Sequence, residues 1–185
     1  MAVHLIKHMK NSKINIGLIN PKSPENVSSV MRSAGNFGVD HVFYTGSRYP
    51  RAVRLNPDIP RMSRKVSEDI PLSGVECLID SVPAEMKIVC VEFAENAIPL
   101  PAYQHPENAF YIFGPEDNSI TQDIINRADD VVYVPTNGCM NLSAAVNVLL
   151  YDRLAKSFSS SASKHDFENN DLIRQNRDLN NRLKV

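Results

Sequence analysis

Short apolar runs alternate with amphipathic stretches along most of this chain. Runs rich in β-branched and aromatic residues predict strands at residues 14–19, 41–45, 87–92, 110–113 and 131–134. Apolar positions at helical spacing predict helices at residues 25–37 and, with approximate ends, at 74–82, 119–128 and 141–156. Gly38 is typical of the residue that ends a helix. The alternation predicts an α/β fold with an open, mostly parallel sheet flanked by helices.

Two segments depart from this pattern. Between residues 48 and 65 prolines interrupt the periodicity, and basic residues outnumber acidic ones, which predicts an excursion from the fold. From residue 158 onward the chain is rich in Ser and Asn and poor in apolar residues, which is typical of a polar tail that forms a lone helix or is disordered. We therefore divide the chain into an N-terminal extension (1–13), one domain (14–157) and a C-terminal tail (158–185).

The overall composition excludes some classes of protein. Twenty Lys and Arg residues against 21 Asp and Glu give a formal charge of −1, so any surface for nucleic acid must be local. The three cysteines lie far apart and have neither zinc nor redox-pair spacing, which predicts reduced thiols, a cytoplasmic protein and no metal site. No secretion signal and no run of eighteen apolar residues occurs, so we expect no membrane span.

Three polar elements are candidates for chemistry. In the first, Asn26 and Arg32 lie on the helix that follows the first strand. Arg32 lies among apolar positions, and a partly desolvated guanidinium usually pairs with a carboxylate or a phosphate. Two interpretations stay open: a structural ion pair between Arg32 and Glu116, or a contact to a ligand.

The second and third elements also lie where a strand leads into a helix. Residues 113–117 (FGPED) end an apolar strand at the edge of the sheet where ligands usually bind, although an ordinary acidic turn has the same pattern. Residues 134–143 contain Gly138, Cys139 and Met140, and Asn141 follows as a possible helix cap. The chain has no G-x-G-x-x-G after its first strand, no Walker loop and no G-x-S-x-G, so common dinucleotide, phosphate and hydrolase sites are absent.

Taken together and in this order, the three elements resemble the three motifs of the SpoU (TrmH-like) branch of the SPOUT methyltransferases. The resemblance covers residues 14–157. It implies a C-terminal segment threaded into a deep trefoil knot, S-adenosylmethionine as cofactor, and a homodimer. It places Gly114, Val134, Cys139 and Met140 in the cofactor pocket, and it assigns catalysis and RNA placement to Asn26, Arg32, Glu116 and Asn141.

Two positions depart from the family pattern. Cys139-Met140-Asn141 stands where the family often has Ser-Leu-Asn, and Ser119 stands where a glycine is common. Cysteine keeps the size of serine but weakens hydrogen bonding, and we interpret Ser119 as a helix cap. Both changes concern the affinity for the cofactor rather than the fold.

The resemblance implies transfer of a methyl group to a ribose 2′-hydroxyl of tRNA or rRNA, and a structured tRNA loop suits such a short enzyme better. A guanidinium is essentially always protonated. We therefore expect Arg32 to grip the phosphate beside the target ribose and to stabilise the developing oxyanion, with Asn26 fixing Arg32 or the sugar. Two rivals remain: a non-catalytic RNA-binding scaffold, and a methyltransferase that acts on a base nitrogen.

The basic excursion is the candidate RNA-binding surface, because arginines beside tyrosines suit a nucleic-acid backbone. A solvated loop is the alternative interpretation. The predicted RNA-binding residues are Arg48, Arg51, Arg54, Arg61, Arg64 and Lys65.

Overall fold

The described part of the chain forms a seven-stranded sheet in which every observed strand pairing is parallel. The computed structural model describes residues 12–56 and 67–161, together with 173, 174, 180 and 183. The strands, in sheet order, are β3 (Leu72–Gly74), β2 (His41–Tyr44), β1 (Ile14–Leu18), β6 (Ala109–Phe113), β4 (Lys87–Val91), β7 (Asp130–Tyr133) and β5 (Ile98–Pro99). The predicted α/β class and mostly parallel sheet are confirmed.

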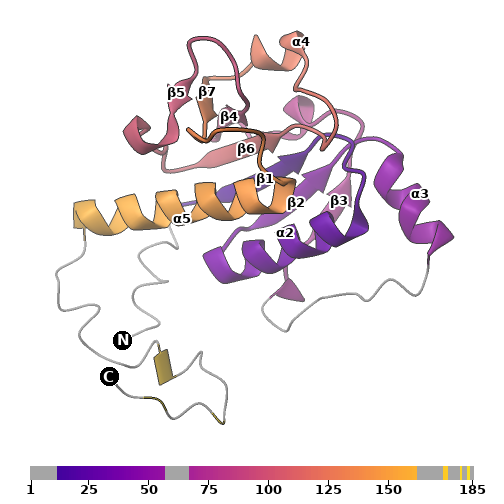
Figure 1. Cartoon of the computed structure of the whole chain (residues 1–185), viewed down its shortest axis with the longest axis horizontal. Coiled ribbons are helices and arrows are strands. Elements are labelled where there is room, and N and C mark those ends of the chain that lie inside the picture. The colour runs from indigo at the N-terminus through magenta and orange to yellow at the C-terminus, as the bar shows by residue number, and fades with distance from the viewer. Residues whose placement is uncertain (1–11, 57–66, 162–172, 175–179, 181–182, 184–185) are drawn as a thin grey trace.

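Successive side chains of the central strands point to opposite faces of the sheet, so the hydrophobic core is divided between the two faces. Ile14, Ile16 and Leu18 of β1 pack in one cluster with α2 (Pro24–Phe37) and α5 (Leu142–Ser161), which lie side by side in Figure 1. Phe110 and Ile112 of β6 point the other way, into a smaller cluster with the 3₁₀ turn η3 (Ile79–Ser81). Both faces are covered, as a parallel sheet requires.

The sequence around α2 explains its ends. The Ser23 side chain caps the helix by accepting a hydrogen bond from the backbone of Asn26, and Pro24 occupies the first turn, where its missing N–H costs nothing. Gly38 ends the helix in the left-handed conformation at φ 69°. The predicted start and stop of this helix are therefore confirmed, and Asn26 is fixed in the first turn.

Four predictions of secondary structure need correction. The predicted helix at 74–82 is wrong: β3 ends at Gly74, and only the three residues of η3 are helical, because the start of the segment pairs with the sheet through β3. The basic excursion contains a helix, α3 (Arg48–Leu55), in which Pro50 occupies the first turn. The helix predicted at 119–128 shrinks to α4 (Gln122–Ile125). The connection after β4 carries the short strand β5 and the 3₁₀ turn η4 (Leu100–Ala102).

The strand order fixes where a ligand site can form. From β1 the chain moves outward to β2 and β3, whereas β6, β4, β7 and β5 lie on the other side of β1. The loops that follow β1 and β6 therefore meet at the carboxyl edge of the sheet beside this reversal, the usual ligand position in open α/β sheets. No helix among the described residues has the length and apolar character needed to cross a membrane. The predicted tail lies mostly outside the described residues, and α5 continues past its predicted end to Ser161.

Candidate active site

A chain of side-chain hydrogen bonds joins the three polar elements that the sequence singled out. The Asn141 amide nitrogen donates to the Asn26 amide oxygen at 3.0 Å, and the Asn26 amide nitrogen donates to Glu116 Oε1 at 3.0 Å. These residues lie 90 and 115 positions apart from one another in sequence. The loop after β6, the first turn of α2 and the start of α5 therefore form one polar site.

The direction of these hydrogen bonds follows from the chemistry of the two ends. A carboxylate only accepts, so Asn26 must turn its NH₂ group toward Glu116 and its oxygen toward Asn141. Asn141 in turn donates to Asn26 and uses its own oxygen to cap α5, accepting from the backbone of Ser143 at 3.0 Å. The predicted cap is confirmed, and each amide is held in a single orientation.

Glu116 is the anchor of this chain. It accepts hydrogen bonds from the backbone N–H groups of Lys22 and Ser23 at 2.8 and 3.1 Å, as well as from Asn26. Partial burial by itself would raise the pKa of the Glu116 carboxyl, but the hydrogen bonds from Asn26, Ser23 and Lys22 outweigh it and lower that pKa. Glu116 is therefore an ionised acceptor that pins the loop after β1 to the loop after β6.

Arg32 lies elsewhere on α2 and does not touch Glu116. Its side chain is half-buried and makes no hydrogen bond or ion pair to another residue of the described ranges. The structural pairing with Glu116 is thus wrong: the donors that Glu116 meets are the backbone of Lys22 and Ser23 and the amide of Asn26. No described residue accepts a hydrogen bond from the Arg32 guanidinium, so its N–H donors are available to bind a ligand.

A pocket of about 320 Å³ lies at the carboxyl edge of the sheet, next to the polar chain. Glu116 lines this pocket. So do all four residues of the predicted cofactor set, which are Gly114, Val134, Cys139 and Met140. Its other walls include Phe93, Phe113, Tyr133 and Leu142. A pocket of this size with aromatic and aliphatic walls and a few polar groups is typical of a small-molecule site.

Glu92 is a pocket residue that the sequence analysis missed. Its two carboxylate oxygens accept from the backbone of Ile120 at 2.8 Å and of Phe93 at 2.9 Å, which fixes the carboxylate in the pocket wall. A Cβ on Gly114 would come within 3.3 Å of Glu92 Oε2, so the glycine leaves room for this acid. The sequence signal that could have identified Glu92 is its place directly after the apolar strand at 87–91, at the carboxyl edge of the sheet.

The two departures from the family pattern occupy different surroundings. Cys139 is an exposed free thiol on the pocket wall. Ser119 is not a helix cap as predicted, because α4 starts later, at Gln122, with Thr121 in the cap position. The Ser119 backbone instead donates to the side chain of Asn118 at 2.9 Å. Both positions line the pocket, where a change would alter ligand affinity.

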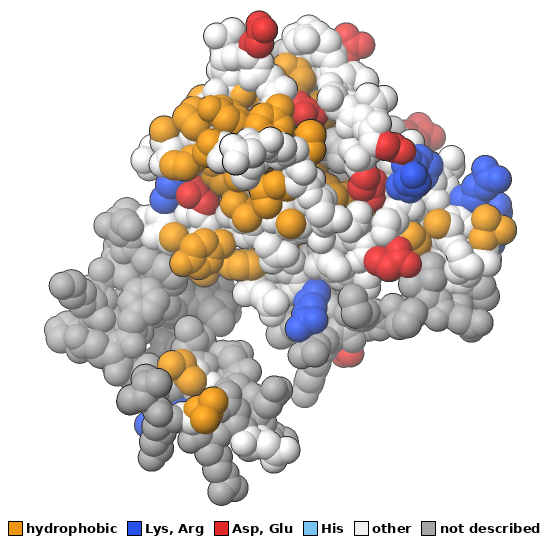
Figure 2. Space-filling view, in the orientation of Figure 1, with side chains coloured by type: hydrophobic (Ala, Val, Ile, Leu, Met, Phe, Trp, Pro, Cys, Tyr) orange, Lys and Arg blue, Asp and Glu red, His pale blue; other side chains and the backbone are white. Residues whose placement is uncertain are grey.

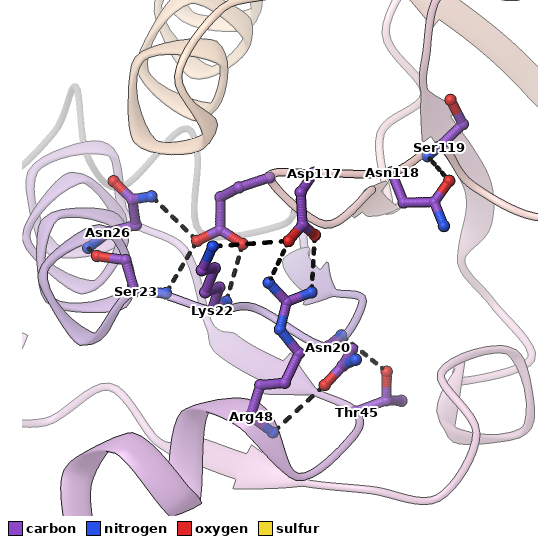
Figure 3. Close-up of polar contacts among 10 residues, drawn as sticks. Asn20, Lys22, Ser23, Asn26, Thr45, Arg48, Asp117, Asn118 and Ser119 are labelled. Carbon is purple, nitrogen blue, oxygen red and sulfur yellow. Dashed lines mark hydrogen bonds and ion pairs between the residues drawn. The ribbon is translucent and has the colours of Figure 1, made fainter.

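The predicted RNA-binding residues separate into three groups. Arg48 is paired with Asp117 through two hydrogen bonds of 2.8 Å, as Figure 3 shows. Arg51 and Arg54 are exposed on α3. The remaining three, Arg61, Arg64 and Lys65, lie outside the described residues.

Comparisons with known proteins agree with this geometry. The SpoU rRNA Methylase family matches residues 13–151 of the chain. The tRNA (cytidine-2′-O-)-methyltransferase TrmJ of Methanocaldococcus jannaschii is 26% identical over 161 residues, which cover 77% of this chain and 68% of that protein.

Two solved structures share the fold. The TrmH/SpoU tRNA-modifying enzyme of A. aeolicus superposes with a TM-score of 0.68 at 17% identity, covering 85% of this chain and 86% of that one. The SpoU methyltransferase AviRb of Streptomyces viridochromogenes, solved with its cofactor AdoMet, superposes with a TM-score of 0.66 at 19% identity, covering 80% and 59%. The predicted family resemblance is confirmed, and with a family match over three quarters of its length the chain belongs to the SpoU rRNA Methylase family.

Proposed function

We propose that this methyltransferase transfers a methyl group from S-adenosylmethionine to a ribose 2′-hydroxyl of RNA. One observation carries the proposal: the hydrogen-bonded chain from Asn141 through Asn26 to Glu116, which gathers all three family motifs at the rim of one pocket. The related TrmJ enzyme is named for this chemistry on a cytidine of tRNA.

The residues of the pocket suit S-adenosylmethionine, which when bound supplies an electrophilic methyl group on a positively charged sulfur. Phe93, Tyr133 and Leu142 offer apolar surface for the adenine ring. Among the described residues, the pocket wall carries the carboxylates of Glu92, Glu116 and Asp117 and no Lys or Arg, which favours a cationic ligand. Gly114, Val134, Cys139 and Met140 would hold the cofactor largely through backbone groups.

The chain's own groups must position the ribose and stabilise negative charge on its oxygen. The Arg32 guanidinium, whose donors are available among the described residues, would bind the phosphate beside the target ribose and stabilise the developing alkoxide. Asn26 would orient the sugar or Arg32, and Asn141 and Glu116 hold Asn26 in register. Positioning of this kind accounts for a large share of the rate of such a displacement.

The RNA partner would reach the site across α3, where Arg51 and Arg54 are exposed, and the basic residues that follow would extend the same contact. We propose tRNA as the substrate. The observation behind this choice is the tRNA substrate in the name of the related TrmJ. We also place the enzyme in the cytoplasm, where its free cysteines would stay reduced.

The remaining family properties belong to the same proposal. We propose a knotted C-terminal half in residues 14–157, and a homodimer whose subunits together complete the RNA site. Figure 2 looks onto the face that carries α5 and shows apolar side chains gathered around this helix. On α5 itself Tyr151 is 64% exposed and Val148 is 37% exposed, which suits a helix that a second subunit covers.

Isothermal titration with S-adenosylmethionine tests the proposal against a non-catalytic scaffold. We expect saturable binding of one cofactor per chain to the wild-type protein. A Gly114→Leu variant, whose side chain would press on Glu92 and Ile120 and so distort the pocket wall, should lose this binding, whereas Gly138→Ala, at a position with open space around it, should retain it. Failure of the wild type to bind cofactor, with or without tRNA, would favour the scaffold instead.

A further inference from the structure

Three loops at the carboxyl edge of the sheet are joined through Arg48, the first residue of α3. Its guanidinium donates to both oxygens of Asp117, each at 2.8 Å, and its backbone N–H donates to Asn20 Oδ1 at 3.4 Å. Figure 3 shows the side chain of Arg48 reaching from α3 to the loop after β6, with Asn20 beneath it. Arg48 therefore connects the loops that follow β1, β2 and β6.

The backbone around Arg48 is shaped to hold this contact. Asn20 adopts a left-handed conformation at φ 41°, and its N–H donates to Thr45 Oγ1 at 3.2 Å. Gly46 is also left-handed, at φ 76°, and a Cβ there would collide with the Asn20 side chain. A residue with positive φ and no side chain is thus required for the Asn20 amide to reach Arg48.

The partner of Arg48 belongs to the pocket. Asp117 lines the cavity next to Glu116 and Gly114, so the guanidinium braces the cofactor pocket wall from behind. The Arg48 side chain is 29% exposed, and the fork geometry is the favourable one for a carboxylate. Hydrogen bonding to Arg48 and its positive charge lower the pKa of the Asp117 carboxyl, so the pair remains ionised at neutral pH.

This contact gives Arg48 a different task from Arg51 and Arg54, which are exposed on the same helix and have no such anchor within the described residues. We propose that Arg48 is a positioning residue that couples helix α3 to the cofactor loop, so that cofactor binding and RNA binding strengthen each other. The inference rests on the proposed function, because it needs a cofactor in the pocket and RNA on α3. Linkage requires that the two ligands raise each other's affinity by the same factor.

The test measures the affinity for fluorescently labelled unfractionated tRNA with and without saturating S-adenosylhomocysteine. We expect the product to raise the affinity of the wild type about threefold or more. In Arg48→Gln and in Asp117→Asn the factor should fall to about one. The double variant should be no worse than either single variant, because the two changes remove one interaction.

Two variants serve as controls. Arg127→Gln breaks an ion pair of the same length, 2.8 Å to Asp80, whose two residues are not part of the pocket lining, and should keep the wild-type factor. Arg54→Gln should weaken tRNA binding but leave the factor unchanged. An unchanged factor in Arg48→Gln, or additive losses in the double variant, would overturn the inference while leaving the proposed function intact. Absence of S-adenosylhomocysteine and S-adenosylmethionine binding to the wild type would overturn both.

Discussion

Two polar networks lie at opposite edges of the sheet, and they differ in how many of their hydrogen-bonding groups still face solvent or a pocket. At the carboxyl edge, Asn141, Asn26 and Glu116 are exposed or half-buried and border a pocket. At the amino edge a second network surrounds His105, whose side chain is 5% exposed. There Tyr111 and Arg153 are buried, and the hydrogen bond between them ties β6 to α5.

In the second network the polar side chains hydrogen-bond to one another and to nearby backbone carbonyls. Arg153 donates to Tyr111 Oη at 2.9 Å and to the carbonyl oxygens of Pro106 and Glu107. The Tyr111 hydroxyl and His105 Nδ1 lie 2.7 Å apart, and His105 Nε2 and Asp152 Oδ2 lie 2.9 Å apart. A neutral imidazole that accepts from Tyr111 and donates to the carboxylate satisfies both contacts.

The comparison separates groups that serve stability from groups that serve chemistry. Buried polar groups that are all satisfied rigidify a fold. The pocket edge instead holds oriented amides and carboxylates that still face solvent and the cavity, and Arg32 has no partner among the described residues. Preorganised groups with spare capacity are what a catalytic site requires. Changes at the amino edge should therefore alter stability, and changes at the carboxyl edge should alter activity.

The largest effect is expected at the amino edge, from Arg153→Ala. The change leaves two backbone carbonyls and the Tyr111 oxygen without their donor in a buried site, so the free energy of unfolding should fall by about 3 kcal/mol. Chemical denaturation measures this. Arg127→Ala, at an exposed ion pair, is the control and should leave stability unchanged within error. Equal losses in the two variants would remove the distinction between buried and exposed networks.

Arg32→Lys should have the next largest effect, and on activity alone. Lysine keeps the charge but loses the bidentate fork, so kcat/KM for methyl transfer should fall about 100-fold, which corresponds to about 2.7 kcal/mol. The melting temperature and the affinity for S-adenosylmethionine should stay as in the wild type. Undiminished turnover would contradict the role given to Arg32.

Glu116→Gln should reduce activity less, about tenfold in kcat/KM, or about 1.4 kcal/mol. Glutamine keeps one acceptor oxygen and puts an NH₂ group in place of the other, so it cannot accept at both positions from Asn26, Ser23 and Lys22. The hold on the Asn26 amide therefore weakens. Steady-state kinetics on tRNA measures the change. Asp123→Gln, an exposed acid on α4 outside the pocket lining, is the matched control and should keep wild-type kinetics.

A smaller effect concerns pH. Burial lowers the pKa of His105 below its ordinary value of 6.5, against an opposing effect of Asp152, so the imidazole stays neutral in the fold. The unfolded chain takes up a proton near pH 6.5. The associated stability is therefore complete above that pH and is lost as pH falls toward the lowered pKa. Denaturation at pH 7.5 and 5.5 should show the loss, and His105→Gln should reduce it; an identical pH dependence in both proteins would refute this.

The smallest effect is expected from the exposed arginines of α3. The double variant Arg51→Gln with Arg54→Gln should weaken tRNA binding a fewfold at low salt. The slope of log affinity against log salt concentration should become shallower by up to about two, because two phosphate contacts are lost. A salt dependence equal to that of the wild type would remove α3 from the RNA-binding surface.

Much of the fold and part of the site could be predicted because they depend on local sequence. Ser23, Pro24 and Gly38 determine the ends of α2, and the apolar runs at β1 and β6 need no long-range information. The pairing of Arg48 with Asp117 could not be predicted from the sequence, because the two residues are 69 positions apart and only the strand order brings them together. The amino-edge network escaped prediction for the same reason: His105 and Asp152 look like ordinary surface residues in sequence.

The most direct test of the central claim is nucleoside analysis of tRNA after incubation with the protein and methyl-labelled S-adenosylmethionine. We predict label in 2′-O-methylnucleosides with the wild type, and a marked loss with an Asn26→Leu variant that still binds the cofactor. Label in base-methylated nucleosides, or cofactor binding without transfer to any RNA tested, would contradict the account.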